Sequence, residues 1–205
     1  MAAVEQDCDG FECDVRLSKD GAPILWHDPS LRKINGSSQP IASLLFQEIQ
    51  NSYPEIMTLP ELLSIAVKFK KDVAIETKHP VPSGREVEEV VTRLARNFNN
   101  DIHISLMSFS WFAIESVRSE IETTMLLHDF TGKMASRFTS AQNLGPNIGT
   151  LRRKPELVNE AHAQGKKLFV WTVDTVEDLE LCAHLEVDVI ATNKPSLARK
   201  VLGYP

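Results

Sequence analysis

Residues 10–31 read GFECDVRLSKDGAPILWHDPSL, and this stretch decides how the chain begins to fold. Within it, Phe11–Leu17 alternates apolar and polar side chains, which is the period of a β-strand. The turn signal Lys19-Asp20-Gly21 follows, and Ala22–Trp26 predicts a second short strand. The stretch therefore predicts two neighbouring strands joined by a tight turn.

The rest of the chain repeats a short β-like run and then a segment of helical period. Further strands are predicted at Val73–Lys78, Ile102–Met107, Thr123–Leu127, Asn147–Gly149, Lys167–Thr172 and Val187–Thr192. Helices are predicted from Thr58, after a capping box at Ser83–Glu86, over Trp111–Val117 and Pro155–Ala163, and from Thr175 and Pro195. This alternation indicates an α/β fold of parallel strands covered by helices. About seven of these are main strands, which is one fewer than the eight that close a (β/α)8 barrel.

Composition restricts the class of protein. The chain has 205 residues, of which 42% are hydrophobic, so we expect one globular domain and not a disordered or fibrous protein. The net charge of −6 argues against nucleic acid as a partner. No apolar run approaches the roughly 18 residues of a membrane span, and the N-terminus does not read as a signal peptide. Three unpaired cysteines, Cys8, Cys13 and Cys182, suit a reducing compartment, so a cytoplasmic location is expected.

Three carboxylates and one lysine have spacings that predict a common site. Glu12 and Asp14 are two residues apart on the first strand, so they share a face, roughly 6.5–7 Å apart at Cα. Glu76 and Lys78 repeat that spacing on the next main strand, and catalytic groups of barrels gather where strands end. Three carboxylates suit Mg²⁺ or Ca²⁺, and a neighbouring lysine suits a phosphate. Two plainer interpretations stay open: a solvent-facing antiparallel strand, and a Glu–Lys bridge at the rim.

Two further side chains are candidates near the same mouth. His27 follows a predicted strand and precedes Asp28-Pro29, so its imidazole can exchange protons at the strand exit. The alternative is an exposed turn histidine that pairs with Asp28. Trp171 ends a strand and either walls the mouth or packs in the core. His79 is a weaker candidate, and the histidines without a motif are expected to be structural: His103, His128, His162 and His184.

The motifs of the chain resemble those of glycerophosphodiester phosphodiesterases. The run Gly10–Gly21, with Pro23 and His27–Leu31, resembles the signature of that family, and Ala74–Lys78 is similar to its Glu-x-Lys strand. Less specific similarities lie at Ser108-Phe109, Gly165–Val173, Val187-Asp188 and Thr192–Pro195. The resemblance implies a TIM-type (β/α)8 barrel that hydrolyses glycerophosphodiesters to glycerol phosphate and an alcohol.

The resemblance also implies a role for each candidate residue. Glu12, Asp14 and Glu76 would hold a divalent cation, either Mg²⁺ or Ca²⁺. His27 would be one of two acid/base histidines, and Lys78 would contact the phosphate. The partner is then a small-molecule glycerophosphodiester, with Trp171 at the border of its pocket.

One departure from the family pattern is large. Members of the family open with a strand that ends in His-Arg-Gly, soon followed by Pro-Glu-Asn-Thr, and neither segment appears here. We therefore expect residues 1–205 to form a single barrel domain that lacks its first strand, and to self-associate through its open strand edges. Two alternatives stay open: an inactive remnant that keeps the metal site, and another metal-using barrel enzyme that acts on sugar phosphates.

Overall fold

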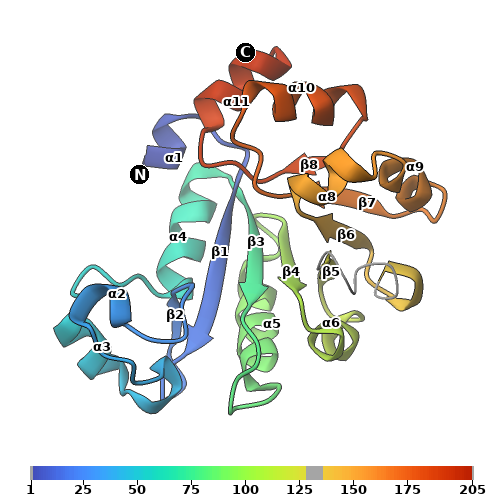
Figure 1. The fold of residues 1–205 in the computed structure, drawn as a ribbon. Coiled ribbons are helices and arrows are strands. Elements are labelled where there is room, and N and C mark those ends of the chain that lie inside the picture. The colour runs from blue at the N-terminus through green and yellow to red at the C-terminus, as the bar shows by residue number, and fades with distance from the viewer. Residues whose placement is uncertain (1, 128–135, 205) are drawn as a thin grey trace. The chain divides into compact units, whose positions relative to one another are not determined.

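Figure 1 shows the computed structural model, which describes residues 2–127 and 136–204. The chain forms two compact units: residues 10–106 with 119–121, and residues 1–9 with 107–118 and 122–205. The strands are β1 (Gly10–Leu17), β2 (Pro23–Leu25), β3 (Asp72–Thr77), β4 (Ile104–Ser108), β5 (Glu122–Leu127), β6 (Asn143–Pro146), β7 (Lys167–Val170) and β8 (Val189–Ile190). The helices are α1 (Ala2–Glu5), α2 (Arg32–Asn35), the 3-10 helix η1 (Ile41–Ser43), α3 (Phe46–Ser52), α4 (Leu59–Phe69), α5 (Glu86–Phe98), α6 (Trp111–Val117), α8 (Ile148–Arg153), α9 (Leu157–His162), α10 (Val176–His184) and α11 (Pro195–Leu202).

In the unit of residues 10–106, the first strand takes part in two ladders. β1 pairs in parallel with β3, from Gly10 opposite Asp72 to Val15 opposite Thr77. Beyond that point the C-terminal end of β1 pairs with β2 in the antiparallel sense. The predicted alternation is confirmed, because Cys13, Val15 and Leu17 are buried while the residues between them are not. Every second side chain of β1 therefore faces away from the core.

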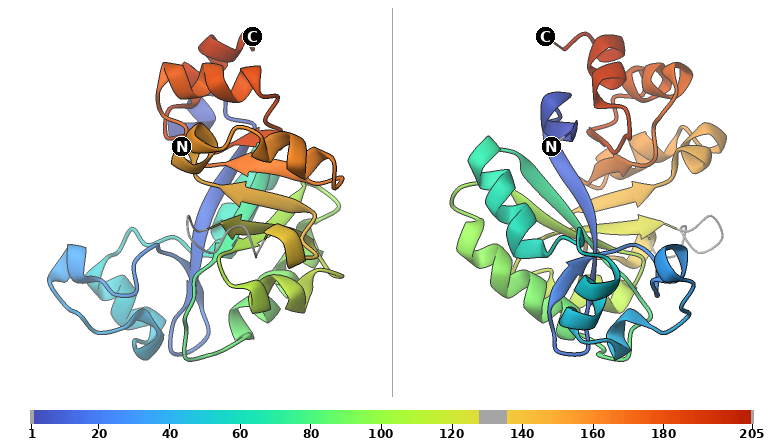
Figure 2. Two further views of the ribbon diagram at one scale, coloured as in Figure 1. Left: turned by 45° about the vertical axis from the view of Figure 1, so that its right-hand side comes forward. Right: turned by 90° about the vertical axis from the view of Figure 1, so that its left-hand side faces the viewer.

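Two helices cover the apolar side of these strands. α4 and α5 both pack against β1, and they lie on one side of β1 and β3 in the right-hand view of Figure 2. α4 begins as predicted, with Thr58 at the N-cap and its backbone N–H donating to Glu61 Oε2 at 2.7 Å. The capping box expected at Ser83–Glu86 does not form. Gly84 adopts a positive φ of 61°, and the resulting turn brings the Ser83 carbonyl to the Glu86 N–H.

Residues between β2 and α4 build a small core of their own, which the sequence analysis left unassigned. Figure 1 shows α2 and α3 gathered beside β2. The buried residues of this segment core are Ile24, Leu31, Ile41, Ile49 and Ile56, and Trp26, Leu44, Phe46 and Tyr53 pack against it. The helices here have four and seven residues, which is too short for a 3.6-residue period to show.

In the other unit, β5, β6, β7 and β8 pair in this order, all in parallel. The strand expected near Asn147–Gly149 lies earlier in the chain, because β6 ends at Pro146. Asn147 instead caps α8, and its side chain accepts from the Thr150 N–H at 2.8 Å. Gly145 lies where β6 approaches β5 closely. A Cβ at this position would lie 2.6 Å from Leu126 Cδ2 and 3.1 Å from Thr124 Cγ2 of β5, so a larger residue would require these side chains to shift.

The basic run Arg152-Arg153-Lys154, before Pro155, lies mostly in a helix. Arg152 and Arg153 belong to α8, and Arg152 forms an ion pair with the buried Asp178 of α10. A charged run is therefore a poor indicator of a loop when one of its members has a buried partner.

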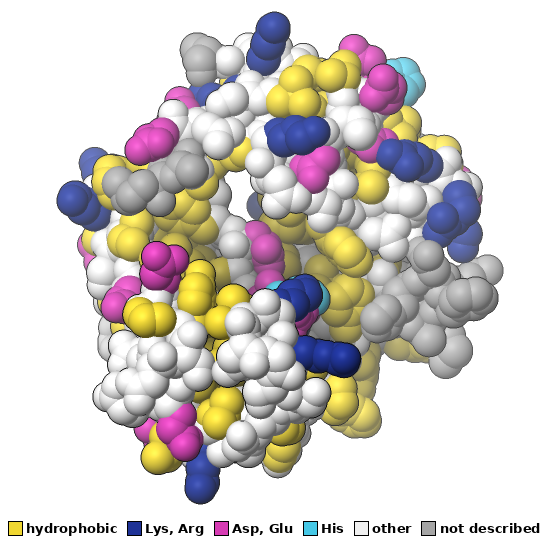
Figure 3. Space-filling view, turned by 60° about the vertical axis from the view of Figure 1, so that its left-hand side comes forward, with side chains coloured by type: hydrophobic (Ala, Val, Ile, Leu, Met, Phe, Trp, Pro, Cys, Tyr) yellow, Lys and Arg dark blue, Asp and Glu magenta, His cyan; other side chains and the backbone are white. Residues whose placement is uncertain are grey.

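The surface carries mixed charges. On the face shown in Figure 3, acidic and basic side chains lie scattered among one another. Among residues 2–127 and 136–204, no helix is long and apolar enough to cross a membrane. The three cysteines form no disulfide; Cys13 and Cys182 are buried, and Cys8 is half-buried.

Candidate active site

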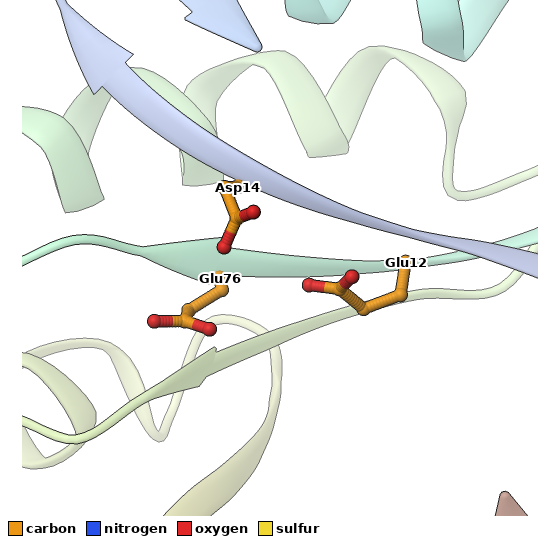
Figure 4. A group of neighbouring side chains, drawn as sticks. All are labelled: Glu12, Asp14 and Glu76. Atoms are coloured by element: carbon orange, nitrogen blue, oxygen red, sulfur yellow. The ribbon is translucent and has the colours of Figure 1, made fainter. Parts of the chain in front are cut away.

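Three carboxyl groups converge at the parallel edge between β1 and β3. Asp14 and Glu76 are direct register partners, and Glu12 precedes Asp14 by two residues on the same face. One carboxylate oxygen from each residue lies within 4.8 Å of the others. Figure 4 shows the three groups turned toward the same space. The structure therefore brings together all three residues that the sequence predicted as metal ligands.

The pairing of the strands explains why the acids meet here. The parallel ladder ends where Val15 pairs with Thr77, so Asp14 and Glu76 lie one residue before its C-terminal end. Glu76 is buried, Asp14 is half-buried, and Glu12 is exposed. The interpretation of Glu12 and Asp14 as a purely antiparallel, solvent-facing strand is therefore wrong, because this part of β1 has a parallel partner.

Lys78 lies between two of the acids. Its Nζ is 2.7 Å from Asp14 Oδ1 and 2.7 Å from Glu76 Oε1. Burial lowers the pKa of Lys78, but hydrogen bonds to these two carboxylates outweigh it and hold the pKa above its usual value. The Glu–Lys bridge that the spacing suggested does exist, and it is part of the acidic cluster instead of an alternative to it.

The cluster has more negative charge than Lys78 balances. Burial, followed by repulsion from Asp14 and Glu76, raises the pKa of Glu12 from its usual value to about 7. Burial also raises the pKa of Glu76, against the opposing effects of Lys78 and His27. Three acids with only one lysine therefore leave an environment that favours a further cation. A hard ion with oxygen ligands matches this donor set.

His27 lies within electrostatic range of the cluster and is held by its neighbour. Its Nδ1 is 2.8 Å from Asp28 Oδ1, and Asp28 Oδ2 also pairs with Lys33 Nζ at 2.7 Å. Hydrogen bonds from Lys33 and His27 lower the pKa of Asp28 to about 2, so this carboxylate stays ionised. An ionised carboxylate only accepts, so Nδ1 carries the hydrogen and Nε2 is left to exchange a proton. The turn pairing of His27 with Asp28 is thus compatible with an acid/base role.

Arg16 is a further residue near the site, and it was not predicted from the sequence. This residue follows Asp14 by two positions on β1, and its Nε and Nη2 donate to the backbone oxygen of His27 at 3.1 and 3.0 Å. Burial lowers the pKa of Arg16 from its usual value, although nearby acids oppose the shift. The signal was present, because the alternation that paired Glu12 with Asp14 extends to Arg16. Arg16 fixes the backbone that carries the His27 imidazole.

Trp171 belongs to the other unit. Its Nε1 donates to the Gly145 oxygen at 2.9 Å, and its ring meets Phe109 edge-on at a centroid distance of 5.6 Å. The side chain is half-buried, so it neither lies wholly in the core nor stands free. Its place at a substrate pocket stays a prediction.

Two other histidines each pair with a carboxylate outside the acidic cluster. His79 Nε2 lies 2.8 Å from Glu88 Oε1, and His162 Nε2 lies 2.9 Å from Asp188 Oδ2. His128 lies outside the described residues. The pairing of His162 fits the structural role expected for it.

Comparisons with known proteins agree with the motifs. Residues 1–197 match the model of the glycerophosphoryl diester phosphodiesterase family. A probable glycerophosphodiester phosphodiesterase 1 from Mycobacterium tuberculosis is 28% identical over 223 residues, covering 94% of this chain and 81% of the relative. A glycerophosphodiester phosphodiesterase from Caldanaerobacter subterraneus is 27% identical and covers 94% of this chain and 85% of its own.

Solved structures show the same fold. The crystal structure of glycerophosphodiester phosphodiesterase from Thermotoga maritima has a TM-score of 0.83 at 23% identity, covering 98% of this chain and 88% of that one. A phosphodiesterase from Oleispira antarctica, solved with the product sn-glycerol-3-phosphate, has a TM-score of 0.85 at 18% identity, covering 98% and 88%. These neighbours are TIM-type barrels, so the predicted α/β barrel class is confirmed.

Proposed function

Because the chain belongs to the glycerophosphoryl diester phosphodiesterase family, a family of phosphoric diester hydrolases, we propose that it hydrolyses glycerophosphodiesters to glycerol phosphate and an alcohol. The observation that carries the proposal is the meeting of Glu12, Asp14 and Glu76 within 4.8 Å, with Lys78 bonded to two of them. The related phosphodiesterase that holds sn-glycerol-3-phosphate supports a small phosphate-bearing substrate.

The three acids fit a divalent cation, and Mg²⁺ or Ca²⁺ is the proposed cofactor. All three donors are carboxylate oxygens, which hard cations prefer over softer metals. Loss of hydration first, and then repulsion from Asp14 and Glu76, raises the pKa of Glu12 to about 7, and a bound cation would oppose both effects. When bound, the cation would draw negative charge from the phosphoryl oxygens.

The residues of the chain supply the other parts of the reaction. Lys78 is proposed to donate to a phosphoryl oxygen, because its ammonium is the positive group among the acids. His27 is proposed to move a proton at Nε2, since Asp28 holds the hydrogen at Nδ1. Arg16 restrains the backbone of His27 and so limits where the imidazole lies. The residues thus divide into phosphate binding, proton transfer and orientation.

We also propose that residues 1–205 act as one domain, that Trp171 borders the substrate, and that copies of the chain associate through open strand edges. The half-buried state of Trp171 supports the second of these, because part of its ring is accessible.

The test is the release of glycerol phosphate from glycerophosphocholine in Mg²⁺, in Ca²⁺ and in EDTA. We expect hydrolysis that EDTA abolishes, and a fall in kcat of about 100- to 10,000-fold in His27→Asn, the usual range for loss of an acid/base group. His184→Asn, at an exposed position, is the control and should keep full activity. Cation binding without any product would support the inactive remnant, and turnover of sugar phosphates alone would support the more distant alternative.

A further inference from the structure

A buried carboxylate lies close to the end of β3 but takes no part in the acidic cluster. Glu88, in the first turn of α5, is 0% exposed, and its Oε1 is 2.8 Å from His79 Nε2. Its second oxygen, Oε2, is buried and has no hydrogen-bond partner among the residues the structure describes. A buried carboxylate is costly unless it is hydrogen-bonded, so the contact with His79 is the one that makes its burial tolerable.

The chemistry of this contact defines the state of the imidazole. A carboxylate only accepts hydrogen bonds, so Nε2 of His79 carries the hydrogen in either charge state of the ring. The bond joins two segments, because His79 is the second residue after β3 and Glu88 belongs to the helix that packs against β1. It therefore ties the end of β3 to α5.

The neighbour of His79 is Lys78, and its backbone is weakly held. The ladder between β1 and β3 ends at Thr77, and the Lys78 N–H reaches the Val15 oxygen only at 3.4 Å. Yet the Lys78 ammonium keeps two contacts of 2.7 Å, which need a well-placed backbone. Lys78 reaches the acids, while His79, in the bend that follows, reaches Glu88 of α5.

We propose that Glu88 and His79 are positioning residues, which anchor the end of β3 to α5 and thereby hold Lys78 between Asp14 and Glu76. The anchor explains why a carboxylate is buried in a helix whose neighbouring buried side chains are mostly apolar. For catalysis the inference rests on the proposed function, but the position of Lys78 can be measured without any turnover.

The direct measurement is the ¹H–¹⁵N signal of the Lys78 ammonium in ¹⁵N-labelled protein. An ammonium held by two carboxylates exchanges its protons slowly and gives a visible signal, which Lys78→Arg identifies by its loss. We expect Glu88→Ala and His79→Ala each to abolish the signal while the backbone spectrum of β1 and α5 is preserved. Glu89→Ala, an exposed neighbour on α5, should leave the signal unchanged.

Glu88→Gln keeps the shape of the side chain and one accepting oxygen, so it should retain most of the signal and guards against loss of folding in the alanine variants. In hydrolysis of glycerophosphocholine, kcat/KM should fall about 10- to 100-fold in either alanine variant, as is usual for residues that orient a site. The double variant should be no worse than the single ones.

A persistent Lys78 signal in both folded alanine variants would overturn the inference, even with an active wild type. If the wild type releases no product, the proposed function fails, but the NMR comparison still decides the positioning role.

Discussion

The two units of the chain each contain a cluster of charges, and the clusters are built in opposite ways. In the unit of residues 10–106, three acids share one lysine, and the pKa of Glu12 rises to about 7. In the other unit, Asp178 accepts from Arg152 Nε at 2.7 Å and from Thr175 Oγ1 at 2.8 Å, and hydrogen bonding lowers its pKa. The first cluster has unbalanced charge, whereas the second is satisfied.

The difference separates a cluster that can bind something from one that joins parts of the fold. Asp178 joins α10 to Arg152 of α8, and the guanidinium balances its charge. Glu12, Asp14 and Glu76 keep more oxygen atoms than Lys78 can serve. Groups with raised pKa values gather at functional sites for this reason, since function needs a charge that the fold leaves uncompensated.

The largest expected effect comes from removing an acid of the unbalanced cluster. Glu76→Gln keeps the side-chain shape but loses a proposed ligand, so metal-dependent hydrolysis should fall by more than about 100-fold, beyond the usual cost of a supporting residue. Titration with Mn²⁺ should show weaker binding, while the free energy of unfolding in EDTA stays the same or rises. Unchanged affinity for Mn²⁺ would remove Glu76 from the ligand set.

The satisfied cluster should respond in the reverse manner. Arg152→Ala leaves the buried Asp178 without its guanidinium, which should lower the free energy of unfolding. Activity per folded molecule should stay within about twofold of the wild type. Urea unfolding and a hydrolysis assay measure the two quantities, with the exposed Arg153→Ala as control. A large loss of activity without a loss of stability would break the contrast between the clusters.

The smallest effect is the dependence of stability on pH through Glu12. Its pKa is about 7 in the folded chain against 4.5 for the free side chain, so the folded state binds more protons between these values. Stability in EDTA should therefore fall as pH rises from about 4.5 to about 7, and level off above that. Above pH 7, Glu12→Gln should raise Tm by about 2–4 °C, and exposed Glu89→Gln should not. Equal pH profiles for Glu12→Gln and wild type would show that the pKa of Glu12 is not raised in the folded chain.

The sequence predicted the site better than it predicted the chain around it. Glu12, Asp14, Glu76 and Lys78 were found because strand alternation is a strict period of two, and the parallel order brought the strands together. Arg16 was missed although the same period reaches it. The pairing of His79 with Glu88 could not be predicted, because it depends on how the turn after β3 meets α5.

The errors in the predicted fold have similar physical causes. β6 was misplaced because its position is set by pairing with β5 and by the close approach at Gly145, which are tertiary constraints. The segment core built around Ile41 and Ile49 was missed because short helices show no clear period. Local signals such as the N-caps at Thr58 and Thr175 were predicted correctly, since they need only neighbouring residues.

The register of β1 against β3 has a consequence for how this sequence can change over time. Asp14 faces Glu76 because six consecutive residue pairs are aligned, and a shift by one residue would turn every second side chain to the other side of the sheet. A one-residue insertion within Gly10–Val15 or Asp72–Thr77 would thus send the acids into the apolar interior. Length variation among descendants of this chain should therefore accumulate between β2 and α4, and spare these two strands.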